Sequence, residues 1–190
     1  LNRFVDEGSQ TEEDYKALLK ILSQSNFDRL GFEKQEGESD EDEMVRQLIV
    51  SNMIKADDET AKAQASQIFD RYRDNLEKLT AAIRLQVLVN QIKHHESKQL
   101  TKLYLDLYVA SNDGSFKNAL STALSYTKDK ETLDELLATW KDKFTVKPQD
   151  LSAWYARFLS RDFTQEAVWT WARENWDWIK AALGGDMSFD

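Results

Sequence analysis

Apolar residues recur along this chain at intervals of three and four, the spacing of an α-helix with one buried face. The pattern occupies the segments 15–22, 85–92, 100–108, 116–124, 133–140 and 151–159. No segment shows the strict alternation of apolar and polar residues that indicates a half-buried strand. The pattern therefore predicts an all-α chain of about ten helices with no sheet.

The distance between successive stripes predicts how the helices stack. In the second half of the chain a new stripe begins every 15 to 18 residues, so one helix and one short turn fit each interval. Two intervals make a helical hairpin of roughly 33 residues, typical of solenoids whose hairpins bury their apolar faces against neighbours. The tetratricopeptide signature W-x₂-L-G-x₂-Y is absent. We expect residues 1–190 to form a single domain, an irregular HEAT-like helical-hairpin solenoid, or superhelix.

Residues that cap or break helices lie between the stripes. Ser9, with a glutamate three residues later, suits an N-cap. Pro148, the only proline, suits a first helical turn. Asp162 or Thr164 is expected to cap the next helix.

Four tryptophans lie in the stretch VWTWARENWDWIKAALGG, residues 168–185. At 100° per residue, Trp169 and Trp176 fall on one side of a helix and Trp171 and Trp178 on the other. A helix with aromatic residues on both sides is usually covered on both sides. The spacing therefore favours one helix inside the stack, ended by the double glycine, over a ligand platform or a membrane anchor. We expect at least three of the four tryptophans to be mostly buried.

Composition narrows the possible partners. The chain has 25 Lys and Arg against 34 Asp and Glu, a formal net charge of −9, and no basic cluster, so nucleic acid is not an expected partner. No apolar run of 18 residues predicts a membrane span. There is no cysteine, which excludes a thiolate metal site and fits a reducing compartment. Both ends, LNRFVDEG and GGDMSFD, look cut from a longer chain.

Candidates for catalysis or metal binding are scarce. The only histidines, His94 and His95, are adjacent, so a helix points them about 100° apart and they cannot hold one zinc ion in the i, i+4 manner. The acidic run ESDEDE, residues 38–43, favours a helix N-terminus near Asp40 over a calcium loop, because it lacks the internal glycine and ligand spacing. No carboxylate pair stands out. We assign no catalytic, cofactor-binding or metal-binding residue, and leave substrate-lining residues unassigned.

Two longer motifs carry a family resemblance. The segment LGFEKQEGESDEDEMVRQLIVSNMI, residues 30–54, is similar to LGW-x₂-K-x-G-E-(S/D) followed by LR-x-L-(I/V). In EAVWTWARENWDWI, residues 166–179, Arg173, Asn175 and Trp176 match a pattern R-x-NW. Together the two motifs resemble the C-terminal helical domain of the aminopeptidase N family of zinc aminopeptidases. This family includes lysyl aminopeptidase and the endoplasmic-reticulum aminopeptidases, and the chain is most similar to its bacterial cytosolic members.

The resemblance implies a non-catalytic domain of a larger enzyme. In this family an earlier domain carries the H-E-x-x-H zinc motif with a downstream glutamate, a G-x-M-E-N loop and a tyrosine for the oxyanion. None of these motifs occurs here. Zinc is therefore expected in the catalytic domain of the parent, and no cofactor in this chain. The parent would remove N-terminal residues from peptides in the cytoplasm. This domain would contact the catalytic domain of the same chain, cover the active site and shape access for peptide substrates.

Two other functions fit the same helical pattern. One is a free-standing α-solenoid scaffold that binds a protein partner in its groove. The other is an independent enzyme with an unrecognised site. A scaffold should carry polar capping helices at both ends, whereas this sequence begins within an apparent helix. The ends therefore favour the interpretation as part of a larger enzyme.

Overall fold

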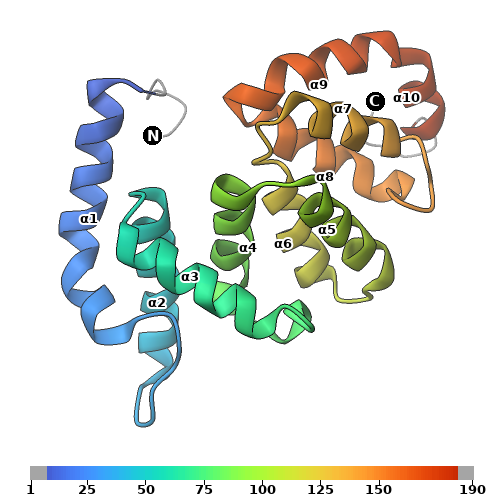
Figure 1. Cartoon of the computed structure of the whole chain (residues 1–190). Coiled ribbons are helices and arrows are strands. Elements are labelled where there is room, and N and C mark those ends of the chain that lie inside the picture. Colours follow the sequence, from blue (N-terminus) through green and yellow to red (C-terminus); the bar gives the residue numbers. More distant parts are fainter. Residues whose placement is uncertain (1–7, 184–190) are drawn as a thin grey trace. The chain divides into compact units, whose positions relative to one another are not determined.

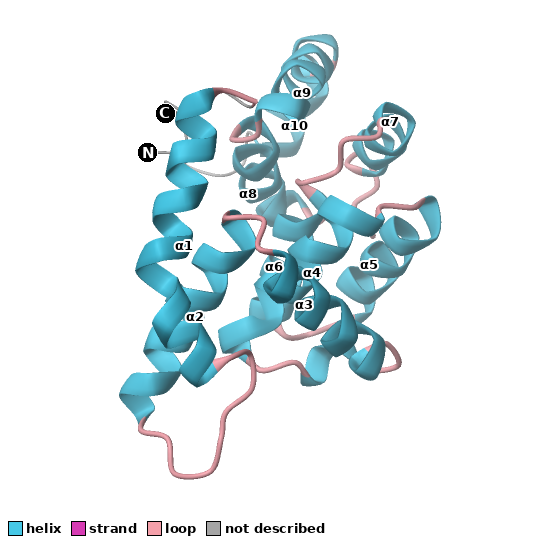
Figure 2. Cartoon of the chain, turned by 60° about the vertical axis from the view of Figure 1, so that its left-hand side comes forward, coloured by secondary structure: helices cyan, strands magenta, loops and turns pink. Residues whose placement is uncertain are grey.

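The computed structural model describes residues 8–183, and this part of the chain consists of helices and connecting loops without a strand (Figures 1 and 2). The all-α prediction is confirmed. The first of two compact units runs to Asn90 and the second begins at Gln91. The helices are α1 (Gln10–Leu30), α2 (Asp40–Lys55), α3 (Glu59–Tyr72), the 3₁₀ helix η2 (Leu76–Lys78), α4 (Ala81–His95), α5 (Lys98–Ala110), α6 (Gly114–Leu124), α7 (Lys130–Thr139), α8 (Pro148–Leu159), α9 (Asp162–Glu174) and α10 (Trp176–Leu183).

Helices pack on others close to them in the chain. In the first unit α1 packs on α2 and α2 on α3. In the second, α5 packs on α6, α6 and α9 pack on α8, and α7 packs on α9. From α4 to α9 the helices begin at residues 81, 98, 114, 130, 148 and 162, so all intervals but the last, which is 14 residues, fall in the predicted range of 15 to 18. These contacts are those of stacked helical hairpins.

The predicted cap at Ser9 is confirmed, because its hydroxyl accepts a hydrogen bond from the Glu12 backbone N–H at 3.2 Å. Pro148 is the first residue of α8, also as predicted. The prediction of a cap at Asp162 or Thr164 is wrong. Arg161 is the N-cap residue of α9, and Thr164 donates its hydroxyl to the carbonyl of Phe158 at 2.5 Å. Thr164 therefore binds the last turn of the preceding helix.

Two lysines of α1 form ion pairs with the turn between α2 and α3. Lys16 lies 2.9 Å from Asp57, and Lys20 lies 2.6 Å from Asp58. Asp58 is also the N-cap of α3 and accepts a hydrogen bond from the backbone N–H of Ala61 at 3.0 Å. One buried carboxylate thus joins α1 to the start of α3.

Trp140, which directly follows α7, lies at the centre of the aromatic core of the second unit. Its side chain is buried, and four aromatic rings surround it edge-on with centroids 5.1 to 6.1 Å away. Edge-to-face contacts of this kind add to the stabilisation from burial alone. The four rings belong to Trp154, Tyr155, Phe158 and Trp171.

The prediction of one continuous helix with buried tryptophans is wrong in two respects. It is broken at Asn175, whose side-chain amide donates to the carbonyl of Trp171 at 2.7 Å and ends α9. The predicted burial of at least three tryptophans is also wrong. Trp169 and Trp176 are 57% and 49% exposed, and Trp171 and Trp178 are half-buried. Trp171 and Trp178 do contact each other, with ring centroids 5.9 Å apart. The double glycine expected to end this segment lies outside the described residues.

Replacing Trp140 by alanine should destabilise the second unit strongly. Loss of a fully buried tryptophan removes its burial and leaves a cavity, so we expect the free energy of unfolding to fall by about 3–5 kcal/mol. Trp169→Ala, at an exposed position, is the matched control and should change stability by less than about 0.5 kcal/mol. Urea unfolding followed by circular dichroism measures both. Equal losses in the two variants would contradict the central position of Trp140.

Asp58 should make the first unit sensitive to acid. Burial by itself would raise the pKa of Asp58, but hydrogen bonds from Lys20 and the Ala61 N–H outweigh it and hold the pKa below its usual value. Such a carboxyl contributes stability above the unfolded pKa of about 4, and this stability is lost as the pH falls through the folded pKa. Asp58→Asn keeps a capping side chain but loses the ion pair. It should lower the urea midpoint at pH 7 more than at pH 3, whereas exposed Asp134→Asn should leave both midpoints unchanged.

Candidate functional site

A groove of about 740 Å³ lies between α7 and α9 in the second unit. Apolar side chains, including Leu133, Leu137 and Trp171, form part of its lining. Three carboxylates and two lysines accompany them, so the groove combines apolar surface with a charged rim. Surfaces of this composition bind ligands through apolar contact and use a few polar groups to fix orientation. The charged residues are Lys128, Lys130, Asp134, Glu166 and Glu174.

The aromatic core around Trp140 packs against one lining residue of this groove. Trp171 lines the groove and contacts Trp140 and Tyr155, with ring centroids 5.4 and 6.0 Å away. The Tyr155 hydroxyl and the Trp140 indole N–H are buried and have no hydrogen-bond partner in the described part of the chain. Burial raises the pKa of Tyr155 above its usual value, so its hydroxyl stays neutral. Neither residue lines the groove, and both pack against Trp171, which does.

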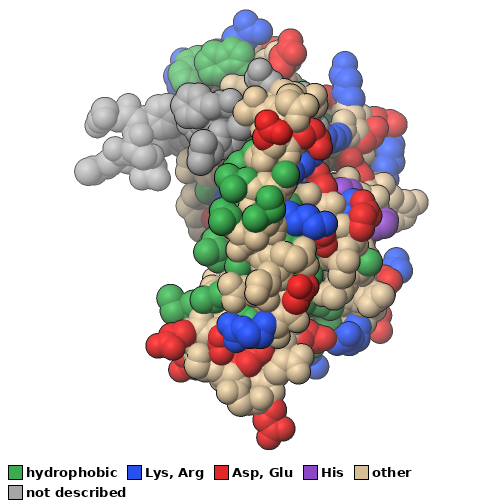
Figure 3. Space-filling view, turned by 90° about the vertical axis from the view of Figure 1, so that its left-hand side faces the viewer, with side chains coloured by type: hydrophobic (Ala, Val, Ile, Leu, Met, Phe, Trp, Pro, Cys, Tyr) green, Lys and Arg blue, Asp and Glu red, His purple; other side chains and the backbone are tan. Residues whose placement is uncertain are grey.

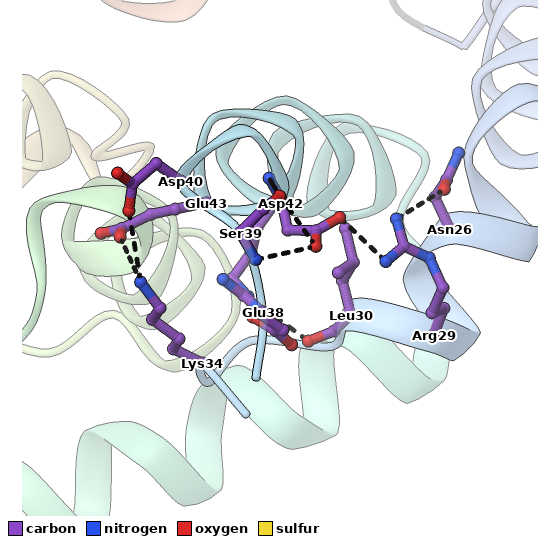
Figure 4. A network of polar contacts seen from close by, with 10 residues as sticks. Asn26, Arg29, Leu30, Lys34, Glu38, Ser39, Asp40, Asp42 and Glu43 are labelled. Atoms are coloured by element: carbon purple, nitrogen blue, oxygen red, sulfur yellow. Dashed lines mark hydrogen bonds and ion pairs between the residues drawn. The ribbon is translucent and has the colours of Figure 1, made fainter. Parts of the chain in front are cut away.

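The acidic run forms a helix N-terminus, as predicted (Figure 4). Ser39 is the N-cap of α2, and its hydroxyl and backbone N–H each lie 3.2 Å from a carboxylate oxygen of Asp42. Arg29 lies 2.8 Å from Asp42 and, together with the Ser39 N–H, holds the pKa of that carboxyl below its usual value. Lys34 lies 3.5 Å from Glu43. Asp42 and Glu43 therefore pair with cations of the protein itself, and the run is a capped helix start.

Arg46 closes the hairpin of α1 and α2. Its side chain is buried, its Nε donates to the Leu30 carbonyl at 3.3 Å, and its terminal nitrogen pairs with Glu38. This hydrogen bond from Arg46 holds the pKa of Glu38 below its usual value. Gly31, which directly follows Leu30 at the end of α1, has a φ of 52°, in the left-handed region that favours glycine. The segment that carries the first family motif, residues 30–54, therefore holds α1 and α2 together.

His94 and His95 are the last two residues of α4 and both are exposed. Among residues 8–183 there is no group of three or more histidine, cysteine, aspartate or glutamate side chains that could hold a metal ion. None of the helices in this range is long and apolar enough to cross a bilayer.

Two surfaces of the structure were not predicted from the sequence. The α7–α9 groove depends on which helices become neighbours, and periodicity carries no such information. The other surface is on α1, where the stripe of Tyr15, Leu18, Leu19 and Leu22 suggested one buried face. Only Leu19 of this stripe is buried, while Leu18 and Leu22 are 51% and 66% exposed. The sequence signal for this surface was the dense apolar pattern of α1, in which Leu18, Leu19, Ile21 and Leu22 cover more than one side of a helix.

The described residues thus form packed helical hairpins with a groove between α7 and α9. The family model of the ERAP1-like C-terminal domain matches residues 1–190, and the chain belongs to this family. The chain is 53% identical over its whole length to aminopeptidase N of Lactococcus lactis subsp. lactis, of which it covers 22%. It is 38% identical to aminopeptidase N of Lactobacillus helveticus, again covering 22% of that protein. It is 25% identical over 72% of its length to glutamyl aminopeptidase of Mus musculus, covering 14% of that protein.

The matches confirm the resemblance to the C-terminal helical domain of aminopeptidase N-type enzymes. For the bacterial relatives they extend over the whole chain. The chain spans about a fifth of the length of the bacterial relatives, 22% in each case quoted.

Replacing Arg46 by methionine should loosen the α1–α2 hairpin. The variant keeps most of the packed volume but leaves the buried carbonyl of Leu30 without its donor, which costs about 1–3 kcal/mol. Arg71→Met is the matched control, because the Arg71–Glu33 ion pair is 2.7 Å long but about half exposed, and exposed pairs contribute little. Urea unfolding should show a clear loss for the first variant only. An unchanged midpoint for Arg46→Met would mean that the hairpin does not depend on this side chain.

Proposed function

We propose that this chain is the non-catalytic C-terminal domain of a zinc-dependent aminopeptidase that removes N-terminal residues from peptides. The observation that carries the proposal is the match of the whole chain to 22% of a protein named aminopeptidase N, at 53% identity. In this proposal the zinc ion and the catalytic groups belong to the catalytic domain of the same polypeptide. That domain and the peptide substrates are the partners, and the enzyme acts in the cytoplasm.

The proposed task of the domain is to cover the active site and to shape substrate access. The α7–α9 groove supports this task, since beside its apolar surface three carboxylates, of Asp134, Glu166 and Glu174, outnumber the two lysines. Carboxylates there attract the ammonium group and basic side chains of a peptide, and the net charge of −9 adds a long-range field of the same sign. Such contacts bind substrate and transition state alike. They therefore affect KM more than kcat.

Reversing a groove charge should change the peptide preference of the full-length enzyme. With Glu166→Lys, we expect the KM for a basic decapeptide to rise several-fold, while kcat for a dipeptide stays unchanged. Asp106→Lys is the matched control, because Asp106 is an exposed carboxylate of α5, outside the groove. Kinetics at two salt concentrations test the cause, since attraction between exposed charges weakens as salt rises.

Two results would contradict the proposal. An unchanged preference for peptide length and charge in Glu166→Lys would remove the groove from substrate access. Chelator-sensitive hydrolysis of aminoacyl-nitroanilides by the pure 190-residue chain would place a reaction centre in this chain itself. We expect the isolated chain to bind no stoichiometric zinc and to show no such hydrolysis.

A further inference from the structure

The first unit exposes apolar side chains on both α1 and α2. Three lie on α1 and three on α2, with exposed fractions from 37% to 76%, and the hydrophobic side chains along α1 are visible in Figure 3. Single exposed leucines are ordinary, but several on two adjacent helices mark an interaction surface. We call this set the α1–α2 apolar face. It consists of Leu18, Ile21, Leu22, Met44, Val45 and Leu48.

The exposed row of α1 has helical spacing of its own. Leu18, Ile21 and Leu22 are three and four residues apart and so share one side of the helix. The buried residues of α1, among them Leu19 and Phe27, lie on another side and pack toward α2. Thus α1 is apolar on two sides, and only one of them is covered in the described structure. A helix with this pattern belongs between two neighbours.

The position of α1 in the stack indicates which neighbour is missing. It is the first described helix of the chain, and the helix it packs on is α2. The terminal helix of a stack of hairpins needs a polar outer face to stay soluble, and α1 presents an apolar one. The bacterial relatives are more than four times as long as this chain, which covers 22% of them, and the family is named as a C-terminal domain. Most of their length therefore precedes the matched region.

We infer that a helix from the part of the polypeptide before residue 1 packs on the α1–α2 apolar face. This inference rests on the proposed function, in which the chain is one domain of a longer enzyme. The partner is an amphipathic helix whose own apolar residues recur every three and four positions, packed 8–10 Å from α1 axis to axis. On its other side α1 is already fixed by the Lys16–Asp57 and Lys20–Asp58 ion pairs. The face is therefore held in place by contacts within the first unit, which lowers the entropy lost on docking.

Cysteine labelling tests the inference, because this chain has no cysteine of its own. Ile21→Cys places one thiol on the apolar face, where Ile21 is 76% exposed. Ala63→Cys, on the exposed side of α3, is the matched control. Each variant is made in the 190-residue chain and in the full-length polypeptide, and maleimide labelling of each site is timed by peptide mass spectrometry. In the isolated chain both thiols should react at similar rates. In the full-length protein labelling at residue 21 should slow at least tenfold, and labelling at residue 63 should not.

Equal labelling of residue 21 in the two proteins would overturn the inference. Slow labelling already in the isolated chain, with a dimer in sedimentation, would also overturn it and would identify a second copy as the occupant. The peptidase activity of the same full-length samples reports on the proposed function separately. A polypeptide without peptidase activity that still protects residue 21 would refute the function and keep the helix contact.

Discussion

A helix that is apolar on two sides has to be covered on two sides, and this requirement organises both units. In the second unit Trp140 follows the end of α7 and is enclosed by rings of α8 and α9, so three helices share one aromatic core. The α7–α9 groove exists because these helices meet over that core. In the first unit α2 is covered by α1 and α3, while α1 keeps an uncovered apolar row.

The high content of acidic residues has a structural use that is separate from any substrate. Carboxylates of Asp58, Asp113 and Asp129 accept backbone hydrogen bonds at the first turns of α3, α6 and α7. Negative charge is favourable there because the unpaired N–H groups of a helix start carry partial positive charge. These three carboxylates therefore help to specify where helices begin. Groove carboxylates such as Glu166 are exposed and take no part in this capping.

Local features of the fold were predictable from the sequence, and features that depend on distant neighbours were not. Helix positions followed from periodicity, and Ser9 and Pro148 marked two starts correctly, because capping involves residues a few positions apart. The same argument failed at Thr164, whose hydroxyl binds the preceding helix. Asn175 broke an apparently continuous pattern through a single side-chain hydrogen bond. The exposure of Leu18 beside buried Leu19, and the groove itself, depend on which helices pack together.

Most of the strong helix–helix packing in the described residues joins helices one or two positions apart along the chain, and this has a kinetic consequence. Contacts between such helices close short loops, so little chain entropy is lost before a hairpin begins to form. Folds dominated by contacts of this kind fold fast and can nucleate in more than one hairpin. A ribosome releases the chain from its N-terminus, at roughly 5–20 residues per second. The α1–α2 hairpin, closed by Arg46 over a sequence separation of 16 residues, can therefore form while α5 to α10 are still being synthesised.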